Sequence, residues 1–80
     1  MYYVYLIKSL EIPEKFYVGY TTDLIQRLET HNSGGSFHTA KYMPWELIMY
    51  LAFEDEAKAK SFEKYLKTHS GRAFLIKRFL

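Results

Sequence analysis

The 80-residue sequence contains no cysteine, which excludes disulfide bonds, thiolate metal sites and thiol nucleophiles. Glycine and proline are scarce, with four and two residues, and the chain has no low-complexity tract or linker. No segment approaches the roughly 20 apolar residues needed to cross a bilayer. The N-terminus lacks the basic and apolar regions of a secretory signal. We therefore expect a soluble, cytoplasmic protein with no membrane partner.

Aromatic residues are abundant, by contrast, with eight Tyr, six Phe and one Trp. Each of these side chains can bury a large area, which a short chain needs because it buries only about 60–65 % of its unfolded surface. With 49 % hydrophobic residues, the composition favours a folded globule over a disordered chain. The length leaves room for one domain, covering residues 1–80.

Charge is unevenly distributed along the chain, although the net charge is only +2. Residues 1–56 contain four Lys/Arg and eight Asp/Glu, whereas residues 57–80 contain seven Lys/Arg and one acid, Glu63. A basic C-terminal surface indicates a polyanionic partner. A lysine-rich helix face that serves solubility explains the same pattern.

Alternation, helical periodicity and turn residues predict an α+β fold with the order β-β-α-β-α-α. Two strands across a short loop should pair antiparallel, which gives a three-stranded antiparallel sheet flanked by about three helices. Gly19 marks a bulge or a close backbone approach in the second strand, and Ser70-Gly71 is expected to break the chain between the last two helices. The predicted strands are Tyr2–Lys8, Phe16–Thr21 and Trp45–Phe53, and the predicted helices are Leu24–His31, Glu56–Thr68 and Arg72–Leu80, with Asp23 and Asp55 as N-caps and a loop over Asn32–Pro44.

Polar residues occupy the apolar stripe of the first predicted helix. At about 100° per residue, Arg27 and His31 share one wedge with Leu24 and Leu28, on the side that faces the sheet. A guanidinium there is costly to desolvate unless it meets an anion. Alternatively, Arg27 extends along apolar surface to solvent or pairs with a core carboxylate, and His31 is a structural histidine.

The second predicted helix places its single central acid in the same way. Glu63 shares a wedge with Ala59, Phe62 and Leu66, so its carboxylate needs a cation, either a metal ion or a basic side chain. An ion pair with Arg27 or Lys67 remains the structural alternative.

Tyrosines alternate along the two predicted N-terminal strands. Tyr3 and Tyr5 share one face of the first strand, and Tyr17 lies on the opposite face of the second strand from Val18. Most strand tyrosines bury a ring and expose a hydroxyl. The sequence contains no acid pair at metal-binding spacing, no phosphate-cradling glycine loop and no nucleophile elbow.

Together these residues resemble the GIY-YIG nuclease family. Tyr3-Val4-Tyr5 and Tyr17-Val18-Gly19 are similar to its two name-giving tripeptides, although the first has Tyr-Val in place of Gly-Ile. The block from Tyr20 to Asn32 resembles the segment that carries the catalytic arginine, and Ala59–Lys67 resembles the segment with the metal-binding glutamate. The resemblance covers nearly the whole chain, in order, and is closest to the small single-domain bacterial branch, which is similar to the nuclease module of the excision-repair endonuclease.

The resemblance implies a metal-dependent DNA endonuclease, with DNA repair as a context. It assigns Tyr17 as the general base or the group that positions the attacking water, Tyr5 as a hydrogen-bonding partner, Arg27 as the phosphate-binding cation, His31 as an assisting residue, and Glu63 as the ligand of one Mg²⁺ or Mn²⁺. An Arg fork and a single-carboxylate Mg²⁺ suit phosphodiester cleavage.

DNA is the expected partner, no small-molecule cofactor is expected, and a homodimer is left open. Candidate DNA-backbone contacts are Lys41, Lys60, Lys64, Lys67 and Arg72. Tyr42 and Trp45 either contact DNA or pin the long loop to the core. A non-catalytic nucleic-acid-binding module of the same fold is the alternative function, and a small partner-binding or structural domain is a third.

Overall fold

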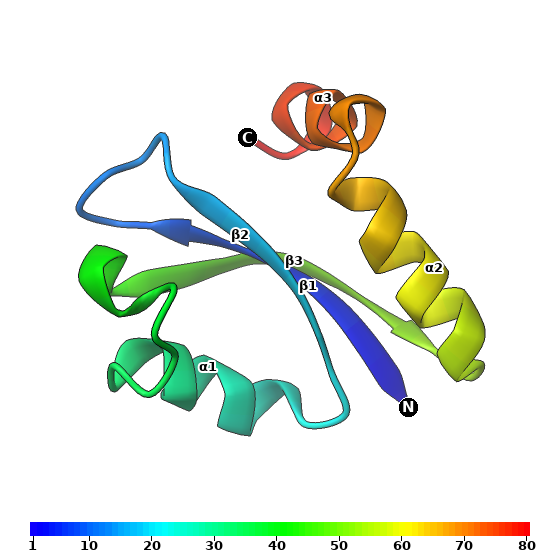
Figure 1. Ribbon diagram of the computed structural model, residues 1–80, viewed down its shortest axis with the longest axis horizontal. Helices are drawn as coiled ribbons and strands as arrows, with labels where there is room; N and C mark the ends of the chain where they lie inside the picture. The colour runs from blue at the N-terminus through cyan, green and yellow to red at the C-terminus, as the bar shows by residue number, and fades with distance from the viewer.

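The computed structural model describes residues 1–80 as three strands and three α-helices, with one additional 3-10 turn. A single sheet separates the helices, with α1 on one side and α2 and α3 on the other (Figure 1). The α+β prediction is confirmed, and the second and third strands begin and end at the predicted residues. The elements are β1 (Tyr2–Ser9), β2 (Phe16–Thr21), α1 (Leu24–Asn32), η1 (Ala40–Tyr42), β3 (Trp45–Phe53), α2 (Glu56–Leu66) and α3 (His69–Arg78).

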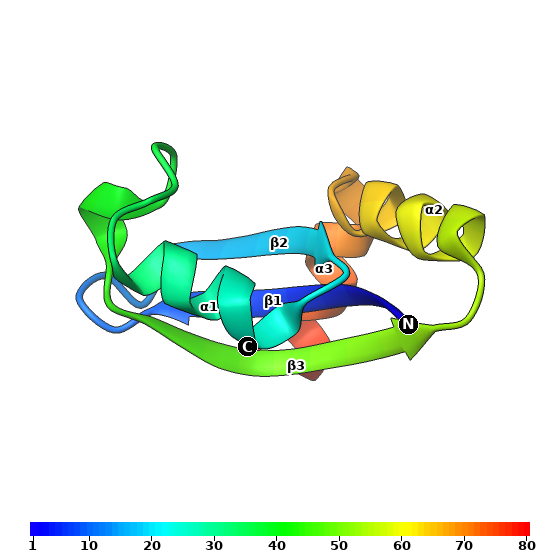
Figure 2. The ribbon, with the colours of Figure 1, turned by 90° about the horizontal axis from the view of Figure 1, so that it is seen from below.

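Strand β1 lies in the centre of the sheet and pairs antiparallel with both neighbours, in the order β2-β1-β3. Its four central residues, from Val4 to Ile7, are completely buried. Apolar residues on both alternating faces of β1 are explained by this double coverage. Figure 2 shows the three strands side by side, with β2 at one edge and β3 at the other.

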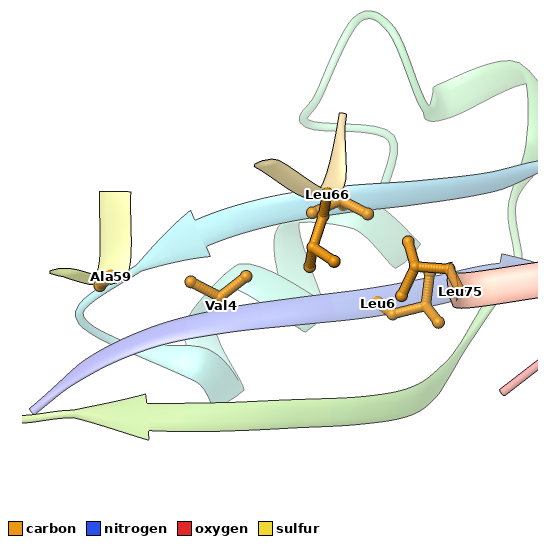
Figure 3. Packing of buried hydrophobic residues seen from close by; sticks show 6 residues of the cluster. Val4, Leu6, Ala59, Leu66 and Leu75 are labelled. Carbon is orange, nitrogen blue, oxygen red and sulfur yellow. The ribbon is translucent and has the colours of Figure 1, made fainter. Parts of the chain in front are cut away.

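The larger core lies between the sheet and helices α2 and α3. Val4 and Leu6 of β1 point toward Ala59 and Leu66 of α2, and Leu75 of α3 closes the cluster (Figure 3). All five side chains are fully buried. Because Ala59 and Leu66 lie seven residues apart on one face of α2, the apolar stripe predicted for this helix is the one that packs.

A smaller core lies on the opposite face of the sheet, beneath α1. Tyr5, Ile7 and Trp45 form its buried centre, and Leu24 and Leu28 of α1 pack against it. Asp23 caps α1 by accepting a hydrogen bond from the Gln26 amide nitrogen, as predicted. This second core contains Tyr5 and Tyr17, two of the residues that the sequence marked as functional.

The junction between α2 and α3 differs from the prediction. Helix α2 ends at Leu66, not Thr68, and α3 begins at His69, not Arg72. Ser70-Gly71 therefore does not break the chain but lies in the first turn of α3, which the Thr68 hydroxyl caps. A Cβ atom on Gly71 would lie 2.0 Å from the Tyr65 carbonyl oxygen, so the glycine serves close packing of α3 on the end of α2.

The loop after α1 is tied to the start of β3. The Asn32 side chain donates to the Trp45 carbonyl oxygen at 3.1 Å and accepts from the Trp45 amide nitrogen. Its amide group thus satisfies both backbone polar groups of Trp45. The Trp45 indole nitrogen donates to the Thr39 carbonyl oxygen at 2.9 Å. The alternative in which Trp45 pins the loop to the core is the observed one. None of the helices is long and apolar enough to cross a membrane.

Candidate active site

Tyr5 lies at the centre of the candidate site because β1 places it directly opposite Gly19 of β2. Its ring covers the Gly19 backbone so closely that a Cβ atom at position 19 would lie 2.3 Å from Tyr5 Cζ and Oη. Gly19 is thus a close backbone approach, the second of the two predicted explanations, and the irregularity in the sheet lies between Leu6 and Ile7 on the β3 side instead.

A buried hydrogen-bonded chain fixes Tyr5 in this position. Tyr5 Oη lies 2.7 Å from His31 Nε2, and His31 Nδ1 lies 2.7 Å from Thr39 Oγ1. Thr39 Oγ1 donates to the Ser36 carbonyl oxygen at 3.5 Å. A neutral imidazole has one donor and one acceptor nitrogen, so neutral His31 donates to one of these two hydroxyl groups and accepts from the other.

Burial keeps the Tyr5 phenol and the His31 imidazole uncharged. Burial raises the pKa of Tyr5 to about 12. The nearby Tyr17 raises this pKa further, and the Arg27 guanidinium lowers it in part. Burial also lowers the pKa of His31, and the positive charge of Arg27 lowers it further. A neutral imidazole and a neutral phenol can form these hydrogen bonds. Tyr5 is consequently suited to positioning its neighbours and not to removing a proton.

Tyr17 lies beside this chain on β2, in a more open setting. Its ring centroid is 5.4 Å from that of His31 and 6.5 Å from that of Tyr5. Its hydroxyl makes no hydrogen bond within the chain, and no buried side-chain polar atom lacks a partner. The Tyr17 hydroxyl is therefore open to solvent, where a water molecule or a phosphate can reach it.

Arg27 has the same combination of partial burial and an available polar group. The chain contains two ion pairs, and neither involves Arg27. Its charge nevertheless acts on both Tyr5 and His31. The predicted alternative of a pair with a core carboxylate is thereby excluded. Hydrogen bonding to Arg27 also lowers the pKa of Tyr5, and the five N–H donors of a guanidinium leave others available to an anion.

Glu63 forms an ion pair with Lys67 near the same surface, so the structural alternative predicted for this carboxylate is the observed contact. The Lys67 Nζ atom lies 2.8 Å from Glu63 Oε2 and 5.7 Å from the centroid of the Tyr17 ring. The Glu63 side chain is 23 % exposed and that of Lys67 is 50 % exposed, so the pair is not enclosed in the core. An exposed pair contributes only about 0.2–1 kcal/mol, so a stronger cation can replace Lys67.

The donors that surround Glu63 decide what kind of metal site it can form. No group of three or more His, Asp or Glu side chains forms a cluster that could enclose a metal ion. Mg²⁺ is commonly held by one or two carboxylates, with waters and substrate phosphates completing its shell. Glu63 alone fits an ion of that kind, which the substrate helps to bind, and does not fit a closed protein cage.

The predicted DNA-binding residues fall into two places. Lys60, Lys67 and Arg72 lie along edge strand β2, over the rings of Tyr20, Tyr17 and Phe16, respectively. Lys60 also pairs with Glu56 at 3.6 Å. Lys41 lies apart, in η1, over the ring of Tyr42. Lys64 is exposed on α2 and forms no ion pair.

Two residues near the site were not predicted from the sequence. Thr39 anchors His31 from the long loop, where a threonine carries no periodic or motif signal. Lys15 lies at the end of the first loop, with its ammonium 5.4 Å from the Tyr42 ring centroid. The sequence gives one signal for Lys15 as a residue near the site. It lies two positions before Tyr17, on the same face of an extended chain.

Comparison with known proteins agrees with this geometry. The model of the GIY-YIG catalytic domain matches residues 1–77. The chain belongs to the GIY-YIG family. It is 36 % identical over 72 residues to a UPF0213 protein of Streptococcus pyogenes, a match that covers 89 % of this chain and 76 % of the relative.

Two further relatives connect this GIY-YIG domain to a solved structure and to a named activity. The solution structure of the UPF0213 protein BH0048 from Bacillus halodurans is similar, with a TM-score of 0.57 and 30 % identity, over 96 % of this chain and 84 % of that one. A Giardia intestinalis homologue of the structure-specific endonuclease subunit SLX1 is 31 % identical over 75 residues, which covers 89 % of this chain but 21 % of that protein. These matches support endonuclease activity in general terms.

Proposed function

We propose that this GIY-YIG domain is a metal-dependent DNA endonuclease that hydrolyses phosphodiester bonds at the surface between β2, α1 and α2. The observation that carries the proposal is the contrast between fixed and available groups. Tyr5 and His31 are buried and hydrogen-bonded to each other, whereas the Tyr17 hydroxyl beside them makes no hydrogen bond in the protein and the Arg27 guanidinium has no carboxylate partner. Unpartnered groups of this kind, held by a rigid support, suit a reactive substrate.

Each available group has a role that its chemistry allows. Arg27 binds the scissile phosphate with its planar fork and stabilises the negative charge that develops on the phosphate oxygens. Tyr17 positions the attacking water through its hydroxyl oxygen and, when ionised, accepts a proton from that water. Tyr5 and His31 keep the Tyr17 ring in place by packing against it.

Glu63 would hold the divalent cation in this proposal, in place of its partner Lys67. A bound Mg²⁺ or Mn²⁺ would supply positive charge that stabilises the reacting phosphodiester. The exposed ion pair and the position of Lys67 over Tyr17 support this arrangement, because displaced Lys67 remains close enough to contact a DNA phosphate.

The cation row along β2 supports DNA as the substrate. Lys60, Lys67 and Arg72 lie beside the edge strand that carries Tyr17. Lys60 and Lys67 pair with Glu56 and Glu63, and Arg72 forms no ion pair. Positive charges in a row follow a phosphate backbone without reading its sequence, and binding of this kind weakens as salt is raised.

A cleavage assay with matched variants tests the proposal. Purified protein is incubated with supercoiled, branched and single-stranded DNA in Mg²⁺, Mn²⁺ or EDTA. Glu63→Gln is compared with Glu56→Gln, because both glutamates belong to ion pairs with a lysine four residues later on α2. Tyr17→Phe is compared with Tyr50→Phe, an exposed tyrosine on β3.

The expected result is metal-dependent cutting that falls by roughly a hundredfold or more in Glu63→Gln and Tyr17→Phe, with both control variants close to wild type. Cutting that survives in Glu63→Gln at the wild-type rate contradicts the assignment of the metal ligand. DNA binding without cutting in any metal supports the non-catalytic module instead.

A further inference from the structure

Two lysines converge on one tyrosine at the end of the sheet away from α2. Lys15 comes directly before β2, and Lys41 belongs to η1, 26 positions further along the chain. Their ammonium nitrogens lie 5.4 and 5.3 Å from the centroid of the same Tyr42 ring. Two segments far apart in the sequence thus bring two positive charges to one place.

No carboxylate neutralises this pair. The two ion pairs of the chain lie along α2 and its C-cap residue Lys67, and neither includes Lys15 or Lys41. Two like charges at one ring repel each other, and the negative face of an aromatic ring compensates them only in part. An anion bound beside the Tyr42 ring would be attracted by both ammonium groups and would offset this repulsion.

Buried Ser9 holds both lysine-bearing segments in place. Its amide nitrogen donates to the Lys15 carbonyl oxygen at 3.0 Å, and its hydroxyl donates to the Tyr42 carbonyl oxygen at 2.6 Å. The Tyr42 ring also packs edge-on against Trp45, with centroids 6.4 Å apart. The backbone below the lysine pair is therefore fixed, and only the two flexible side chains need to adjust to a ligand.

The lysine pair lies next to the candidate active site along β2. Lys15 and Tyr17 are two residues apart and share one face of the extended chain, which separates their Cα atoms by about 6–7 Å. A nucleic-acid strand advances roughly 3.4 Å per nucleotide along its axis. A phosphate bound by Lys15 and Lys41 would therefore lie one or a few nucleotides from the phosphate at Tyr17.

An exposed aromatic ring adjoins the pair. Phe37 is 89 % exposed, and it lines a surface hollow together with His38, Ala40 and Lys41. The loop after α1 that carries Phe37 projects past the outer edge of β2, upward in the view of Figure 2. An exposed ring next to a phosphate-binding cation is the arrangement by which proteins stack an unpaired base.

We propose that Lys15, Lys41 and Tyr42 form a second phosphate subsite, and that Phe37 stacks on the base next to the phosphate bound there. The inference rests on the proposed function, because it assigns where the substrate strand continues beyond the cleaved bond. The subsite binds the strand and takes no part in the chemical step.

Binding measurements without metal test the subsite separately from cleavage. Anisotropy of a short, labelled single strand is measured in EDTA over a series of salt concentrations. The variant Lys15→Ala/Lys41→Ala is compared with Lys58→Ala/Lys77→Ala, which removes the same charge from helices α2 and α3. Lys15→Arg/Lys41→Arg keeps the charge, and Phe37→Ala removes the ring.

The subsite variant is expected to bind roughly tenfold more weakly, and its salt slope should fall by about 0.7 for each phosphate that the protein no longer neutralises. The control pair should stay within about twofold of wild type, and the arginine pair should retain binding. Phe37→Ala should bind about fivefold or more weakly to a normal strand, but should differ little from wild type on a strand with an abasic site at the stacked position.

Each outcome separates this inference from the proposed function. If wild type cuts DNA while the subsite and control pairs bind alike, the subsite is overturned and the nuclease stands. If wild type binds through the lysine pair but cuts in no metal, the subsite stands and the nuclease is overturned. If wild type binds no DNA, both are overturned.

Discussion

Replacing Gly19 with alanine tests the geometry that supports the whole site. The new Cβ atom would lie 2.3 Å from Tyr5 Cζ and Oη. The Tyr5 ring cannot move aside freely, because it is fully buried and its hydroxyl is bound to His31. The substitution must therefore displace a packed aromatic side chain.

The magnitude follows from the two interactions that the displacement disturbs. Forcing extra atoms into a packed core costs about 1–3 kcal/mol, and losing the Tyr5–His31 hydrogen bond costs about 0.5–1.5 kcal/mol. The expected loss in the free energy of unfolding is roughly 2–4 kcal/mol. For a domain of this size, that loss lowers Tm by roughly 10–25 °C.

Urea unfolding of four proteins measures the effect and its cause. The set is wild type, Gly19→Ala, Tyr5→Leu and the double variant, which form a double-mutant cycle. Leucine lacks the ring atoms that the new Cβ meets, so the cost of Gly19→Ala should shrink by half or more in the Tyr5→Leu background. Gly35→Ala, at an exposed loop position where the new Cβ would lie 3.1 Å from Thr30 Cγ2, should cost less than about 1 kcal/mol.

Two results would refute this reasoning. One is a cost of Gly19→Ala below about 1 kcal/mol, which is less than overpacking of a rigid core allows. The other is an equal cost with and without the Tyr5 ring, which would show that the glycine is required for a different reason.

Three further predictions follow from other contacts. Gly71→Ala should destabilise the fold by about 2 kcal/mol or more in urea unfolding, because its Cβ would lie 2.0 Å from the Tyr65 carbonyl oxygen. The pKa of His31 is lower in the folded state, so the unfolded state binds more protons below pH 6.5; stability should therefore fall as pH is lowered from 7 toward 5, and this part of the pH dependence should vanish in His31→Gln. Lys67→Gln should bind Mn²⁺ severalfold more tightly in electron paramagnetic resonance titrations, because the Glu63 carboxylate loses its competing ammonium group.

Matched controls accompany these predictions. His38→Gln should keep the wild-type pH dependence, because that side chain is exposed. Lys60→Gln removes the partner of Glu56, in a pair that does not include Glu63, and should leave Mn²⁺ binding unchanged. An equal gain in Mn²⁺ affinity from Lys60→Gln and Lys67→Gln would show a general charge effect and no role for Glu63.

The sheet and the positions of Arg27 and Glu63 on apolar helix faces could be predicted from local patterns, whereas Tyr5 and Tyr17 were singled out only by the family resemblance. The residue patterns of Phe16–Thr21 and Trp45–Phe53 predict strands, and both strands are observed with the predicted bounds. Helical periodicity places Arg27 and Glu63 on apolar helix faces. A charged side chain there is costly to desolvate, so it indicates a partner of opposite charge or a ligand.

The remaining features depend on contacts between distant segments. The sequence predicts a helix break at Gly71, whereas its close approach to Tyr65 exists only after α3 has packed on α2. Thr39 and Lys15 lie in loops, where no period relates a residue to its neighbours in space. Their partners His31 and Tyr42 are eight and 27 positions away along the chain.

Single-turnover cleavage by Tyr17→Phe tests the central claim most directly. The variant removes one solvent-open hydroxyl and leaves the ring that packs against Tyr5 and His31. With saturating protein and Mg²⁺, we predict a cleavage rate at least about a hundredfold below wild type, with DNA affinity in EDTA unchanged. A rate within a few-fold of wild type, at equal affinity, would contradict the role of Tyr17 and the site built around it.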